Sequence, residues 1–490
     1  MLGLRMGGYT SVVNDPPPLA DTAIADRHTV VTGTETETYR SLLRTPATRD
    51  ERYALGKALR KKVPRRTLSR WPDGAGRPDP VDLIKASHQG RIERLIPVRV
   101  GRMAASPYAF LRGAAVVMAR DVSQLPTTGI MPVVCGDAHL GNFGFYASPE
   151  RDLVIDLNDF DEAHPGGWEW DLRRLVASIW VAGRENDASE SACDDAVQAC
   201  VTAYQKEVRR LAELPLLVRA FNRLSVDRLT TEADGPLERL VTRSAKRARR
   251  RTGDRALPRF THEVDGVRKI VDEPPLITPL PAREEKLLTK AMDDYLETLP
   301  LYWRRLVGGY TLLDVAQKVV GVGSVGLRAY VALLEGSSPK DVIFLQLKQA
   351  RRSVLARYVH GDSPLHAHQG QRVVEYQQCL QTVSDPLLGW TTVDGRQFYV
   401  RQLRNMKGRI PLDELDAKML TGYASVVGQL LAKGHARTSG ASMIAGYLGH
   451  SGRVSEALAG FARRYADQTE ADHAGLLSAV ERGALPVEYE

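Results

Sequence analysis

Residues 131–163 read MPVVCGDAHLGNFGFYASPERDLVIDLNDFDEA, and this stretch contains the clearest pattern in the chain. It contains short runs of apolar and β-branched residues, MPVVC and DLVIDL, bounded by Gly, Asn and a Pro-Glu-Arg turn. This pattern predicts strand, loop, strand, turn and strand. Asp137 and Asn142 fall in the first loop, and Asp156 falls at the end of the last strand.

These residue types in this layout indicate phosphoryl transfer. One carboxylate must accept the proton of the attacking hydroxyl, and an amide oxygen and a second carboxylate must hold the magnesium that bridges the phosphates. Asp137 is the predicted base, and Asn142 and Asp156 are the predicted metal ligands. Asp159 and Asp161 follow in NDFDEA, and either of them could be the metal ligand instead. The alternative is that these residues only cap turns, which Asp and Asn often do.

A second cluster, GVGSVG, contains Gly321, Gly323, Ser324 and Gly326. A lone G-x-G-x-x-G pattern has two interpretations. In a dinucleotide-binding unit it lies between a strand and a helix, and an acidic residue ends the next strand. In a kinase it joins two strands and covers the phosphates of ATP.

The residues after this turn favour the kinase interpretation. The next strand, VIFLQLK, ends in Lys348 rather than in Asp or Glu. Lys348 is predicted to contact the α- and β-phosphates, and Glu375, in the helical segment QGQRVVEYQQCLQ, is predicted to pair with it. Because the Gly-rich turn and Lys348 follow the catalytic loop instead of preceding it, the kinase-like fold would be circularly permuted.

The pattern GDxHxxN followed by ID resembles the aminoglycoside and choline kinase-like phosphotransferases, whose loop usually reads HGDxHxxN. Cys135 stands here in place of the first His. The resemblance implies that Asp137 is the catalytic base, that Asn142 and Asp156 bind metal, and that Asp171, in WEWDLRR, braces the catalytic loop.

Longer motifs extend the resemblance to nearly the whole chain. They include VGRMAASPYAFLRGAA, CGDAHLGNFGFYASPER, LNDFDEAHPGGWEWDLRRL, VVGVGSVGLR, GQRVVEYQQ and LAKGHARTSG. These motifs resemble a bacterial family named Domain of Unknown Function 2252, from about residue 50 to about residue 480. That resemblance implies that both clusters belong to one module, but it implies no activity. Arg102 and Arg112, which flank SPYAF, could clamp a substrate anion or form ion pairs within the fold.

The composition is that of an ordinary globular protein. The chain has 490 residues, of which 43% are hydrophobic and 26% are charged, and its net charge of +8 fits anionic ligands such as nucleotides without indicating nucleic acid. The four cysteines have no CxxC spacing, which argues against a zinc site or a disulfide framework. We find no apolar run long enough for a membrane span and no secretory signal, so we expect a cytoplasmic protein.

The sequence therefore predicts an α+β, kinase-like, two-lobed and permuted fold with extra helices. We expect a disordered tail at 1–48, a helical region with the catalytic loop at 49–310, a β-rich nucleotide-binding lobe at 311–405 and a helical region at 406–490. The predicted function is phosphoryl transfer from ATP, with Mg²⁺, to an unidentified acceptor that is expected to be a small molecule. Transfer of AMP, nucleotide binding without catalysis, and dinucleotide-dependent redox chemistry are the alternatives.

Overall fold

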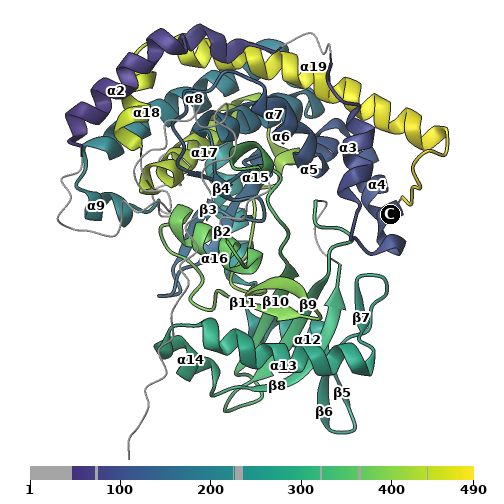
Figure 1. Ribbon diagram of the computed structural model, residues 1–490. Helices are drawn as coiled ribbons and strands as arrows, with labels where there is room; N and C mark the ends of the chain where they lie inside the picture. The colour runs from purple at the N-terminus through teal and green to yellow at the C-terminus, as the bar shows by residue number, and fades with distance from the viewer. Residues whose placement is uncertain are drawn as a thin grey trace, which may run out of the picture.

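A computed structural model describes residues 47–71, 76–224, 226, 235–319, 323–361, 366–438 and 440–489. The fold is mixed α+β, as predicted, with a helical part and a part built on an antiparallel sheet (Figure 1). The predicted tail at 1–48 lies outside the described residues, except for its last two positions. No helix in the described ranges is both long enough and apolar enough to cross a membrane.

The helical part is formed by segments from both ends of the described chain. In Figure 1 the early helices and the late helices lie together, and α19 runs along the outside. Helix α8 packs against α17, and α7 packs against α19, around a core that includes Trp168, Trp180 and Tyr204. The helices of this part are α2 (Arg49–Lys62), α3 (Pro80–Ser87), α4 (Ile96–Ala104), α5 (Pro107–Gly113), α6 (Ala115–Ser123), α7 (Trp168–Glu185), α8 (Glu190–Glu213), α9 (Leu216–Ala220), α11 (Gly235–Arg249), α17 (Ala417–Thr438), α18 (Ala441–Leu448) and α19 (Arg453–Glu481).

The second part is a six-stranded sheet with the order β11-β12-β10-β9-β8-β7, in which all neighbours are antiparallel. Its strands are β7 (Ile277–Pro279), β8 (Thr311–Lys318), β9 (Ala329–Glu335), β10 (Val342–Gln349), β11 (Gly389–Val393) and β12 (Arg396–Gln402). Helix α13 (Ala282–Thr298) packs on β8 and β11, next to α14 (Leu301–Val307), and α16 (Gln369–Leu380) packs on β11 and β12. Because β7 and α13 belong to this part, it begins before residue 311, the boundary expected from the sequence.

Side chains alternate between the two faces of β10 and β12, and this alternation determines which residues point away from the core beneath α13. In β10, Leu345 and Leu347 lie in the core beneath α13, so Gln346 and Lys348 point to the opposite face. In β12, Phe398 and Val400 lie in that same core, and their alternation turns Tyr399 and Arg401 to the face of Lys348. Lys348 is the direct cross-strand partner of Tyr399.

Small strands join the two parts. The hairpin of β2 (Phe143–Ala147) and β3 (Leu153–Leu157) is fully buried and forms the predicted strand-turn-strand unit. Strand β1 (Val133–Val134) pairs with β4 (His164–Pro165), which brings the two ends of the 131–163 stretch together. A separate hairpin is formed by β5 (Thr261–Val264) and β6 (Val267–Ile270), with its turn at Asp265-Gly266. The short helix α12 (Gly253–Phe260) precedes it, and α15 (Ala356–Val359) follows β10.

Candidate functional site

The loop between β1 and β2 is hydrogen-bonded to the side chain of Asp171, at the start of α7. The two carboxylate oxygens of Asp171 accept hydrogen bonds from the backbone N–H groups of Cys135 (2.6 Å) and Gly136 (2.8 Å). His435 Nε2 lies 3.2 Å from Asp171, and its Nδ1 lies 2.8 Å from the Tyr204 hydroxyl. Asp171 is 1% exposed, so it braces the loop and does not reach a ligand. This placement agrees with the bracing role that the resemblance implied.

Asp137 lies at the open side of this loop. The Arg174 guanidinium donates hydrogen bonds to Asp137 Oδ1 at 2.7 Å, and the Asp137 side chain stays 23% exposed. Burial raises the pKa of Asp137 to about 6, although the charge of Arg174 opposes the shift. A carboxylate with such a pKa is suited to take a proton near neutral pH.

Asn142 connects the Asp137 loop to Asp159. Its amide nitrogen donates to the carbonyl oxygens of Asp137 (3.1 Å) and Asp159 (3.0 Å), and its oxygen accepts the N–H of Asp159 at 2.7 Å. Asn142 is 3% exposed, so its side chain fixes the position of Asp159. His139 Nδ1 accepts the N–H of Gly141 at 3.1 Å, so His139 orients the loop.

Asp156 is placed away from this cluster. It lies inside β3, is 2% exposed, and forms a buried ion pair with Lys433 of α17. Its Oδ1 also accepts the N–H of Leu157 at 2.9 Å. The carboxylate predicted to bind metal is therefore occupied by a structural ion pair, because strand β3 continues past it and buries it.

Lys348 meets the two carboxylates that follow β3. Its ammonium lies 2.5 Å from Asp161 Oδ2 and 3.4 Å from Asp159 Oδ2. The Tyr399 hydroxyl donates to Asp161 Oδ1 at 2.8 Å. Burial acts to lower the pKa of Lys348, but the charges of Asp159 and Asp161 outweigh it and raise the pKa above its usual value.

The charge state of Asp159 follows from the same contacts. Burial opposes ionisation, yet Lys348 and Arg401 together hold the pKa of Asp159 well below its ordinary range. Its side chain is 47% exposed, so this ionised carboxylate reaches the solvent while Lys348 is buried behind it. Lys348, Asp159 and Asp161 form what we call the acidic-lysine cluster.

The described part of the Gly-rich segment, residues 323–326, lies in the chain between the antiparallel strands β8 and β9 and contacts this cluster through Ser324. Ser324 Oγ donates to Asp161 Oδ2 at 3.3 Å, and Gly326, at φ 85°, accepts the N–H of Ile92 at 2.7 Å. Gly323 is exposed and lies near the backbone of Arg112, whereas Gly321 lies outside the described residues. A dinucleotide-binding turn leads from a strand into a helix, so a connection between two strands does not match that alternative.

The structure does not bring Lys348 and Glu375 together as the sequence predicted. Glu375 lies on α16, but its carboxylate contacts His366 Nε2 at 2.9 Å and Gln371 Nε2 at 2.8 Å. These two contacts lower the pKa of Glu375, with His366 contributing most. Among the residues that the structure describes, Lys348 pairs with Asp159 and Asp161.

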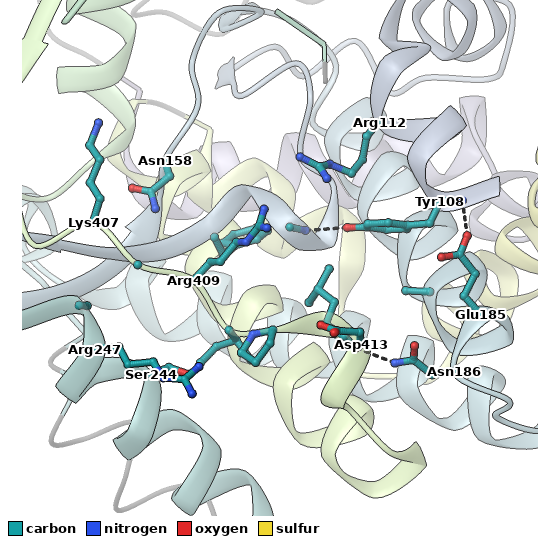
Figure 2. A pocket seen from close by; sticks show the side chains of 18 of the residues that line it. Tyr108, Arg112, Asn158, Glu185, Asn186, Ser244, Arg247, Lys407, Arg409 and Asp413 are labelled. Atoms are coloured by element: carbon teal, nitrogen blue, oxygen red, sulfur yellow. Dashed lines mark hydrogen bonds between the residues drawn. The ribbon is translucent and has the colours of Figure 1, made fainter. Parts of the chain in front are cut away.

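A cavity of about 680 Å³ lies beside the Asp137 loop (Figure 2). Its wall includes Gly141 of the loop and Asn158, the neighbour of Asp159. The remaining wall comes from α5, the C-terminal end of α7, α11 and the segment 407–413. The volume is in the range of small-molecule sites.

Comparison with known proteins places the chain in one family. A family model described as an uncharacterized protein conserved in bacteria (DUF2252) matches residues 91–479. The chain belongs to the DUF2252 family. No curated protein and no solved structure matches it.

The DUF2252 match covers the Asp137 loop, the acidic-lysine cluster, the Gly-rich segment and the cavity wall. Three of the residues that complete this site in the DUF2252 chain were not predicted from sequence: Arg174, Tyr399 and Arg372. Arg174 lies three residues after Asp171, so helical spacing places both on the face of α7 below the loop. Arg372, from α16, donates to the carbonyl oxygens of Asp161 (2.7 Å) and Arg351 (2.9 Å) and so fixes the backbone of the acidic segment.

Proposed function

We propose that this DUF2252 protein is a phosphotransferase that moves the γ-phosphoryl group of ATP, with Mg²⁺, to a hydroxyl group of a small-molecule acceptor. The observation that carries the proposal is the ion pair between Lys348 and Asp159, which are 189 residues apart in the chain. Asn142 ties Asp159 to the loop of Asp137. A candidate base, candidate metal ligands and a candidate phosphate-binding lysine therefore lie in one continuous network.

The order of elements around Lys348 supports a kinase-like arrangement. In kinases a Gly-rich turn between strands covers the phosphates, a later strand supplies the lysine, and an aspartate after the catalytic loop holds Mg²⁺. Here the turn between β8 and β9 precedes Lys348 on β10, and helix α16 follows. Since the Asp137 loop comes earlier in the chain, we propose a circularly permuted version of that arrangement.

Asp159 and Asp161 fit a magnesium site better than Asp156 does. Mg²⁺ is commonly held by one or two carboxylates together with substrate phosphates and water. Asp159 is ionised and reaches the solvent, and Asp161 lies beside it on the same side of Lys348. A bound Mg²⁺ would neutralise charge on the phosphates, and Lys348 would then contact the phosphate oxygens from the buried side.

The chain's own residues supply the remaining chemistry. Asp137, with its pKa of about 6, takes the proton of the acceptor hydroxyl. The acceptor oxygen forms a bond to the γ-phosphorus while the bond from that phosphorus to the β,γ-bridging oxygen breaks, and ADP leaves with that electron pair. Arg174 and Asp171 act as positioning residues, because they hold Asp137 and the loop backbone in place.

The test combines nucleotide binding with turnover. We expect ATP to raise the unfolding temperature only when Mg²⁺ is present. A ligand at 100 times its Kd stabilises a fold by about 2.7 kcal/mol, so the binding should be visible as a shift of the unfolding temperature. Asp137→Asn should retain this protection and lose ADP formation, whereas Lys348→Met should lose the protection. Protection by a nicotinamide dinucleotide but not by Mg-ATP would overturn the proposal, and mass analysis of the products would separate phosphate transfer from AMP transfer.

A further inference from the structure

The cavity beside the catalytic loop has an excess of positive charge. Its wall contains five cationic side chains and two carboxylates. The cationic residues are Arg112, Arg247, Arg251, Lys407 and Arg409, and the acidic residues are Glu185 and Asp413. One of the two carboxylates is already engaged, because Glu185 accepts the N–H of Tyr108 at 2.5 Å.

Several of these cations are not neutralised within the fold. Across the described ranges, the side chains of Arg112, Arg247, Lys407 and Arg409 form no hydrogen bond or ion pair. The Nε of Arg112 is buried and without a partner, which is costly for a guanidinium unless a ligand completes its hydrogen bonds. Burial, together with the charge of Arg401, lowers the pKa of Lys407 well below its usual value although Asp385 and Asp159 oppose the shift, so Lys407 is a poorer anion ligand than the arginines.

The cations are placed where an acceptor would have to lie. Figure 2 shows Arg112 and Arg409 extending toward the same space from opposite walls, beside Tyr108. The Tyr108 hydroxyl accepts the N–H of Gly141 at 2.9 Å, so this wall is in direct contact with the catalytic loop. The charge of Arg112 acts on both Asp137 and His139. A molecule in the cavity would therefore contact the Asp137 loop at Gly141.

We infer that this cavity binds an anionic, hydroxylated small molecule, whose phosphate or carboxylate groups are held by Arg112 and Arg409 while its hydroxyl is presented to the Asp137 loop at Gly141. This inference rests on the proposed function and names the class of its acceptor. Guanidinium groups bind phosphate and carboxylate oxygens in the same planar geometry, and they do so most strongly where water is excluded. Cationic acceptors, such as aminoglycosides or choline, would be repelled by the same wall.

The experiment uses the full chain with its nucleotide cleft filled by Mg²⁺ and a non-hydrolysable ATP analogue. Inorganic pyrophosphate, citrate and choline are titrated separately by calorimetry, so that the first two distinguish phosphate from carboxylate recognition. We expect pyrophosphate or citrate to bind and choline not to bind. Arg112→Gln and Arg409→Gln should each weaken anion binding about tenfold, since each removes charge-assisted hydrogen bonds. Arg249→Gln is the matched control, because Arg249 is exposed on α11 but does not line the cavity.

The outcomes separate this inference from the proposed function. Anion binding that is equal in wild type and Arg409→Gln, or stronger binding of choline, would overturn the acceptor class and leave the phosphotransferase proposal intact. Because Arg409 is exposed, this variant is informative even if Arg112→Gln fails to fold. If Arg409→Gln weakened binding of Mg-ATP itself, the cavity would belong to the nucleotide and the inference would be wrong. Anion binding in Lys348→Met, which should lose Mg-ATP, would support an anion site that does not depend on the nucleotide.

Discussion

Replacing Asp156 by Asn separates a structural ion pair from a metal ligand. The Asp156 and Lys433 side chains are only 3% and 4% exposed, so the substitution leaves an ammonium group buried without its counter-charge. Removing one partner of a buried pair costs about 3–5 kcal/mol. Asn still accepts the N–H of Leu157, so we expect the free energy of unfolding to fall by an amount near the lower end, about 3 kcal/mol.

Urea unfolding followed by tryptophan fluorescence measures this change, because Trp168 and Trp180 lie in the core of the helical part. The control is Asp152→Asn, since Asp152 is 62% exposed and its pairing with Arg223 at 3.5 Å should contribute at most about 1 kcal/mol. Adding Lys433→Met to Asp156→Asn should restore part of the lost stability, because the uncompensated charge is removed.

The same variants are tested for protection by Mg-ATP. If Asp156 is structural, the shift that Mg-ATP adds to the unfolding temperature should be the same in Asp156→Asn and in Asp152→Asn. An Asp156→Asn protein with the stability of the wild type and no magnesium-dependent protection would refute the reasoning and return Asp156 to the metal site.

Three further predictions concern the site. Asp137 must be ionised to act as a base, and its pKa is raised to about 6. We therefore expect kcat/KM to fall as the pH drops through about 6 and to level off above it. A pH profile that is flat from 5 to 8 would exclude this role. Glu375→Gln should leave Mg-ATP affinity within about twofold of wild type, because Glu375 contacts His366 and does not pair with Lys348. Lys348→Met should lower the affinity more than about tenfold in the same calorimetric titration if Lys348 contacts the phosphates as proposed. Asp171→Asn replaces an acceptor of two backbone N–H groups, so it should lower kcat with little change in KM and cost about 1–3 kcal/mol of stability; an unchanged kcat in a destabilised protein would mean that Asp171 supports only the fold.

Local patterns in the sequence were sufficient to predict much of the fold. Helix α2 (Arg49–Lys62) begins at a capping box formed by Thr48 and Glu51, a pattern that is visible in the sequence. The β2–β3 hairpin and the turn at Asp265-Gly266 are also fixed by neighbouring residues, through strand alternation and residues that tolerate positive φ. These features depend on interactions between residues close in the chain, which a single sequence displays.

Pairings across long distances in the chain were the part that could not be predicted. Lys433 lies 277 residues after Asp156, and no local pattern links the two. A signal for Asp159 did exist, because Asp156 lies within the buried run LVIDL, whereas Asp159 is the first carboxylate after β3 has ended. The direction in which the Glu375 side chain points depends on the rotation of α16 about its axis and on the position of His366. Both are set by tertiary packing.

The packing of α8 against α17 has a consequence for how the protein is made. Tyr204 and His435 touch across 231 residues of chain, so the apolar face of α8 leaves the ribosome long before its partner helix has been translated. At about 5–20 residues per second, that delay is of the order of ten seconds or more, during which this face needs temporary shielding from other nascent chains. Premature termination shortly before α17 would leave the face permanently bare, and the truncated product would be expected to aggregate rather than to accumulate as a smaller folded protein.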